Sequence, residues 1–172
     1  MSSVGRTNAA TASAWVRHAL RWSDRIVLTT AAALSAVYLG AIAVQVFYRY
    51  VLEIPSPWTE EMARYLFIWS AFLAAAVSVG RDDQFHIPLL IEKLPRAGRR
   101  FMHVCIDLLQ LTFALIMVRY GSLMANRMMM ARAPVLPLPQ GIVYMVIPIA
   151  GAYMAVHIAC RLIVPGLRTS RA

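Results

Sequence analysis

The sequence is poor in charge, and poorest in negative charge. Only 15% of its 172 residues are charged, against about a quarter in soluble domains, while 60% are hydrophobic and the mean hydropathy is +0.61. Eight acids stand against seventeen lysines and arginines, which gives a formal net charge of +9. Because the arginines cluster between long apolar runs, this balance is typical of membrane topology and argues against nucleic-acid binding.

Motifs that carry chemistry are also scarce. The two cysteines, Cys105 and Cys160, show no CxxC or other metal-ligand spacing, and we interpret both as buried free thiols. The sequence contains no Gly-rich phosphate loop, HExxH or GxSxG. It therefore predicts no enzyme, no metal and no cofactor.

Long apolar runs dominate what is there. A helix needs about 20 apolar residues to cross a bilayer, and four runs qualify, so the predicted fold class is an all-α integral membrane protein. Between the second and third spans, Phe85–Leu94 is too short to span and is predicted to be an interfacial amphipathic segment. The predicted ranges are a disordered segment 1–13, a single membrane domain 14–167 with spans 26–48, 62–80, 101–124 and 141–164, and a tail 168–172.

Lysine and arginine set the orientation of these spans. Twelve lie in the N-terminal segment, the 81–100 loop and the stretch from Arg161 onward, and five lie in the segments on the other side. By the positive-inside rule, both termini are expected to be cytoplasmic in a multi-pass membrane protein. The segments 50–60 and 127–140 then face outward.

The start of the second span has the features of a helix end at a membrane surface. Pro57 suits the first helical position after a Ser56 N-cap, and Glu60 and Arg64 have the four-residue spacing of an ion pair on one helix face. The charges then stop, as they do where a helix enters lipid. Three aromatic residues bracket this turn as interfacial or partner-contacting residues: Trp58, Tyr65 and Trp69.

Polar residues inside the other spans are candidates for function. We hypothesise that Asp107 pairs with His157 or Arg161 and holds the third and fourth spans together; satisfaction of Asp107 by interfacial water is the alternative. His103 and His157 lie near one membrane face, and two such histidines can ligate haem in a four-helix bundle. A haem-binding anchor of a respiratory enzyme is therefore a second functional hypothesis.

Small residues recur every fourth position in three spans, a pattern that permits close helix packing in lipid. No acid or polar cluster falls at mid-membrane depth, and the first span has no central acid of the kind a small multidrug-type transporter would need. These features favour an accessory subunit over a complete transporter. The three rows are Ala32, Ala36 and Gly40; Ser70, Ala74 and Ser78; and Gly151, Ala155 and Ala159.

Several segments together resemble a known family, the small membrane subunit of tripartite ATP-independent periplasmic (TRAP) transporters, or DctQ type. The resemblance covers about residues 20–165, and the cluster around PWTEE is its most specific part. The matching residues are Arg49-Tyr50-Val51-Leu52, Pro57-Trp58-Thr59-Glu60-Glu61, Ala63-Arg64-Tyr65, Trp69, His86-Ile87, Gly141, Tyr144, Ile147 and Pro148.

The resemblance implies a scaffold in a secondary transporter that imports an organic acid with sodium ions. The partners it implies are a separate large DctM-type membrane subunit and a periplasmic DctP-type substrate-binding protein, beside membrane lipid. A structural ion network is expected to join the first two helices on the outer side. Its expected members are Arg49, Glu60, Glu61 and Arg64.

Overall fold

The computed structural model describes residues 4–81 and 96–163. The predicted interfacial segment Phe85–Leu94 and the predicted tail 168–172 lie outside these residues. The described helices are α1 (Val4–Tyr50), α2 (Pro57–Arg81), α4 (Arg96–Met128), α5 (Gly141–Tyr144) and α6 (Val146–Ile163).

Four stretches of helix are long and apolar enough to cross a membrane: His18–Tyr50, Pro57–Gly80, Val104–Met128 and Gly141–Leu162. Each overlaps one of the predicted spans, so the all-α fold class with four spans is confirmed. Within the described ranges there is no strand, only an isolated bridge between Arg132 and Pro139.

Two helix boundaries have clear local causes. Helix α1 reaches back to Val4, into the stretch for which the sequence predicts disorder, and its alanine-rich composition there accounts for the helix because alanine has the highest helix propensity. The last span is interrupted at Met145 between α5 and α6. Pro148 explains this interruption, since it has no N–H to donate to the carbonyl of Tyr144 four residues earlier.

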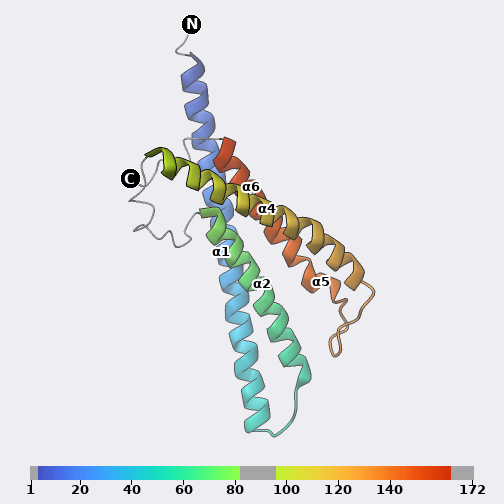
Figure 1. The fold of residues 1–172 in the computed structure, drawn as a ribbon. Helices are drawn as coiled ribbons and strands as arrows, with labels where there is room; N and C mark the ends of the chain where they lie inside the picture. The colour runs from blue at the N-terminus through green and yellow to red at the C-terminus, as the bar shows by residue number, and fades with distance from the viewer. Residues whose placement is uncertain (1–3, 82–95, 164–172) are drawn as a thin grey trace.

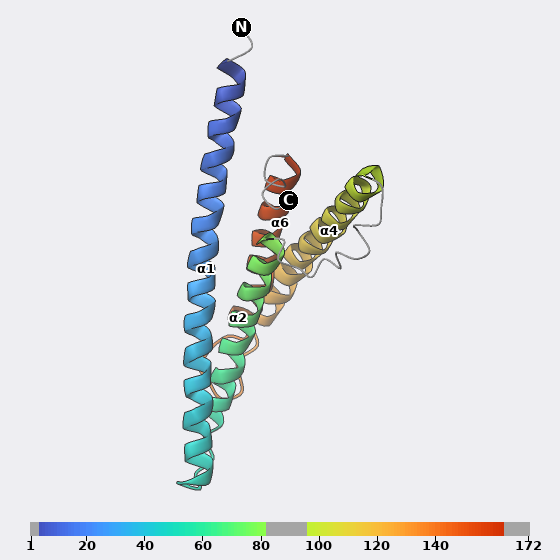
Figure 2. The same ribbon diagram turned by 90° about the vertical axis from the view of Figure 1, so that its left-hand side faces the viewer.

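The helices pack as two antiparallel pairs. Helix α1 lies along α2, α4 lies along α6, and α2 contacts α6 to join the pairs (Figures 1 and 2). We call the end that carries the N-terminal part of α1 and the C-terminus of α6 the terminal end, and the opposite end, with the turn between α1 and α2, the tip end. Between them lies an apolar core of Ala76, Ala114, Met117, Ala150, Met154 and Ile158.

The three small-residue rows differ in how they pack, and in the α2 row Ser70 is buried while Ala74 and Ser78 are exposed. In α6, a Cβ on Gly151 would lie 2.9 Å from the Ala114 carbonyl oxygen, so glycine there permits close approach to α4. In α1, by contrast, Ala32, Ala36 and Gly40 are exposed. The expected packing of that row is therefore wrong within this chain, because α1 is rotated so that a different face meets α2.

Candidate functional site

A cluster of buried polar side chains joins all four long helices at the terminal end. On one side of the cluster, Asp24 of α1 meets two residues of α6. The Tyr153 hydroxyl donates a 2.6 Å hydrogen bond to Asp24 Oδ1, and His157 Nε2 lies 3.4 Å from the same oxygen. The Tyr153 and His157 rings also contact each other, with centroids 4.5 Å apart.

On the other side, Arg161 of α6 links α4 and α2. Its guanidinium forms an ion pair with Asp107 Oδ1 at 3.4 Å and donates a 3.0 Å hydrogen bond to the Val79 carbonyl oxygen. Since residues four apart on a helix share one face, a single stripe of α6 supplies groups to every other long helix. We call this cluster the polar clasp; its members are Asp24, Asp107, Tyr153, His157 and Arg161.

The four titratable members of the polar clasp other than Tyr153 are between 4% and 8% exposed. A charge buried to this degree is tolerated only when it is paired and hydrogen-bonded. The clasp meets this condition by placing an acid against a base twice. Removing any one member would take away a buried polar contact between helices, so the clasp favours one relative arrangement of the four helices.

The backbone of α2 closes one side of the polar clasp. A Cβ added at Gly80 would lie 2.9 Å from the His157 ring, which therefore rests directly against the α2 backbone. The position of His157 is thus fixed by Gly80, Tyr153 and Asp24 together. This ring serves interhelical packing, and the side chain of His103, its partner in the haem hypothesis, lies outside the described residues.

Three members of this cluster, Asp107, His157 and Arg161, were named as candidates from the sequence. The structure brings Asp107 to Arg161, one of the two partners considered, and brings His157 to Asp24. Asp24 and Tyr153 were missed. The available signal was the acid itself: Asp24 is the sole acid in the first 52 residues and directly precedes an apolar run.

A second polar contact lies at the tip end and centres on Glu61. This carboxylate, 6% exposed, accepts a 2.6 Å hydrogen bond from the Tyr65 hydroxyl on its own helix. Its other oxygen accepts hydrogen bonds from the backbone amides of Val135 and Leu136, at 3.0 and 2.9 Å. Glu61 therefore ties α2 to the loop between α4 and α5, a link that no local sequence pattern indicates.

The remaining residues expected at this end lie apart from Glu61. Glu60 and Arg64 form a 3.2 Å ion pair within α2, and both side chains are more than 60% exposed. Arg49 lies 5.9 Å above the ring of Tyr50, and among the described residues no salt bridge joins it to α2. The aromatic side chains differ in burial: Trp58 is exposed and Trp69 is half-buried.

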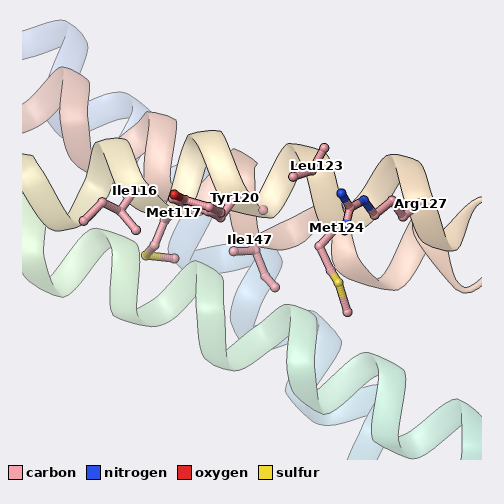
Figure 3. A pocket seen from close by; sticks show the side chains of 8 residues that line it. Ile116, Met117, Tyr120, Leu123, Met124, Arg127 and Ile147 are labelled. Carbon is pink, nitrogen blue, oxygen red and sulfur yellow. The ribbon is translucent and has the colours of Figure 1, made fainter.

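An apolar groove of about 460 Å³ runs along α4 near the tip end (Figure 3). Its walls are mainly Ile116, Met117, Tyr120 and Met124 of α4 with Ile147 of α6, and Arg127 stands at one end. The groove opens at the outside of the bundle. In the described part of the chain, no group of three or more His, Cys, Asp or Glu residues is placed to hold a metal ion.

Comparison with known proteins places this architecture in a family. The family model described as tripartite ATP-independent periplasmic transporters, DctQ component, matches residues 38–165. A TRAP transporter small permease protein of Haemophilus influenzae is 31% identical over 105 residues, covering 61% of this chain and 65% of that protein.

Two further relatives are named for their substrates. The isethionate TRAP transporter permease protein DctMQ of Oleidesulfovibrio alaskensis is 31% identical over 126 residues, or 68% of this chain and 20% of that protein. The sialic acid TRAP transporter small permease protein SiaQ of Vibrio cholerae is 33% identical over 66 residues, or 38% of each chain. The chain thus spans less than two thirds of the length of each of these relatives.

Most of the chain, including all four spans in whole or in part, falls within the matched region. The family is that of a transporter component and not of an enzyme. Four apolar helices and this match together describe a multi-pass protein of the bacterial inner membrane. The chain belongs to the DctQ family of tripartite ATP-independent periplasmic transporters.

Proposed function

We propose that this chain is the small scaffold subunit of a TRAP-type secondary transporter. In this proposal it anchors a separate large DctM-type subunit, which carries an organic acid together with sodium ions. It also helps to dock the periplasmic DctP-type binding protein at the tip end. Isethionate and sialic acid, named for two relatives, are examples of the expected acidic substrate class.

The main support is where the buried polar groups lie. The polar clasp is at the terminal end and Glu61 is at the tip end, while the core cluster between them is apolar and the buried Ser70 hydroxyl of α2 donates to the Phe67 carbonyl of its own helix. An ion or an organic acid crossing a bilayer needs polar partners near mid-depth. The described part of this chain has buried polar links that fix helices together, which suits a rigid anchor.

The orientation is part of the proposal. The described helices put the N-terminal part of α1 and the C-terminal end of α6 at the same end of the bundle (Figure 1). The excess of lysine and arginine near that end favours a cytoplasmic location. The tip end, with the turn after Tyr50 and the loop after Met128, would then face the periplasmic binding protein.

Co-purification tests the scaffold role directly. A tagged large subunit expressed with this chain should yield a stable complex and sodium-dependent uptake, and omission of this chain should abolish both. Glu61→Gln and Arg64→Ala should lower assembly or uptake and leave substrate choice unchanged. Glu53→Gln, a change of an exposed acid in the tip turn, is the matched control. Altered selectivity in either variant, or solute movement by this chain alone in liposomes, would contradict the proposal.

A further inference from the structure

The connection between α4 and α5, residues 129–140, is an apolar hairpin outside any helix. We call it the α4–α5 hairpin. Met130 is 96% exposed, and Val135 and Leu138 are each close to half exposed. Loops in water are usually polar, so a loop that presents these side chains outward is built for a different surrounding.

The backbone of this hairpin has almost no amide left for water. Three of its residues from 131 to 140 are prolines and carry no N–H. Six more donate hydrogen bonds within the protein, so nine of these ten positions are accounted for. The six donors are Ala131, Ala133, Leu138 and Gln140, which bond to backbone carbonyls, and Val135 and Leu136, which bond to Glu61.

This arrangement matters because non-helical backbone is costly wherever water is scarce. Each unsatisfied amide in an apolar medium costs about several kcal/mol of free energy. This cost is also the reason why only helices and closed barrels span membranes. One carboxylate oxygen of Glu61, Oε2, accepts both of these hydrogen bonds, which water would accept in an ordinary loop. A buried carboxylate that accepts hydrogen bonds from two loop amides stabilises the loop most where water cannot reach those amides.

The level of the hairpin in the bundle fits the same interpretation. Glu61 lies about one helical turn inside α2, between Trp58 and Tyr65, which are residues of the kind that mark a membrane interface. The turn between α1 and α2 extends farther along the bundle axis than the α4–α5 hairpin (Figures 1 and 2). With the bundle axis along the membrane normal, the hairpin therefore lies closer to the hydrocarbon core than the tip turn does.

The residues around the hairpin also suit a lipid interface. Exposed Arg127 precedes the hairpin and exposed Arg132 lies within it, so cations stand beside the apolar side chains, a combination that suits an interface with lipid phosphates. The helices that flank the hairpin also expose apolar side chains, such as Met124 of α4 and Ile142 of α5. Exposed apolar side chains with arginines beside them, at the end of candidate membrane spans, favour a lipid interface as the neighbour of the hairpin.

We propose that the α4–α5 hairpin is embedded in the membrane interface at the tip end, with Met130, Val135 and Leu138 among lipid chains and Glu61 replacing water as the acceptor for its amides. The hairpin is a non-helical lipid anchor that holds the α4–α6 pair at fixed depth. This inference stands independently of the scaffold role.

Nitroxide spin labels at single cysteines test the proposal on the full chain in phospholipid vesicles. Cys105 and Cys160 are first replaced by alanine, and labels are placed at Met130→Cys and Leu138→Cys. Leu115→Cys, exposed midway along α4, is the lipid reference, and Glu53→Cys in the tip turn is the water reference. Collision with oxygen, which concentrates in lipid, is compared with collision with a water-soluble nickel chelate.

We expect the oxygen-to-nickel ratio at both hairpin labels to exceed the Glu53 value several-fold and to approach the Leu115 value. Adding Glu61→Ala should lower the ratio at Met130 toward the water reference, because the released amides draw the hairpin outward. Ratios equal to the Glu53 value at both sites would overturn the proposal. So would labels that are water-accessible in the chain alone and become shielded only when the large subunit is reconstituted with it.

Discussion

Replacing Arg161 by methionine tests the energetic role of the polar clasp. Arg161 is 8% exposed, forms an ion pair with Asp107 at 3.4 Å and donates to the Val79 carbonyl at 3.0 Å. The variant removes the Arg161 guanidinium from the Asp107 carboxylate, which is 4% exposed. Breaking a buried pair in this way costs about 3–5 kcal/mol. For a chain of this size each kcal/mol lowers the melting temperature by about 2–4 °C, so a fall of roughly 6–20 °C is expected.

The measurement is thermal unfolding of the purified chain in detergent, followed by tryptophan fluorescence. Arg119→Met removes an exposed arginine of α4 and is the matched control, expected to change stability by less than about 0.5 kcal/mol. The double variant Asp107→Leu with Arg161→Met should recover much of the loss, because both members of the buried pair are then replaced by apolar side chains. The reasoning would be refuted if Arg161→Met melted with the control, or if the double variant melted below both single variants.

Three further changes are checked by the same melting assay. Tyr153→Phe removes a 2.6 Å hydrogen bond to a carboxylate and should cost about 1.5–3 kcal/mol; a loss near zero would show that the bond contributes nothing. Gly80→Ala places a Cβ 2.9 Å from the His157 ring and should cost about 1–3 kcal/mol, whereas Gly40→Ala meets nothing within 4 Å and should be neutral or stabilising. Equal effects of the two glycine changes would contradict the packing described. Glu53→Gly should stabilise the chain by up to about 1 kcal/mol, because φ of +53° strains any residue with a Cβ; a lower melting temperature would argue against strain there.

The spans and the start of α2 follow from local chemistry, and the sequence predicts them well. Long uncharged runs can be satisfied in lipid only as helices, and Pro57 after Ser56 marks a helix start that the structure has at the same residue. Thr59 reinforces that start, since its hydroxyl donates a 2.7 Å hydrogen bond to the Ser56 carbonyl.

The site was less predictable because it depends on helix rotation and on distant backbone. Whether Asp24 or the small-residue row of α1 faces the bundle is decided by how all four helices pack. The partners of Glu61 are amides of Val135 and Leu136, more than 70 residues away, and backbone groups leave no mark in a sequence. Arg64, in contrast, was identified with Glu60 because four-residue spacing is a local property.

The concentration of clasp groups on α6 has a consequence for biosynthesis. Helices emerge from the ribosome in sequence order, so Asp24 and Asp107 enter the membrane before Tyr153, His157 and Arg161 have been made. Before α6 arrives, neither acid has the α6 partners that the structure gives it, Tyr153 and His157 for Asp24 and Arg161 for Asp107. A nascent chain with three spans therefore lacks the polar contacts that join α6 to α1 and α4. The final arrangement of the four helices is thus completed only when the last span has been inserted.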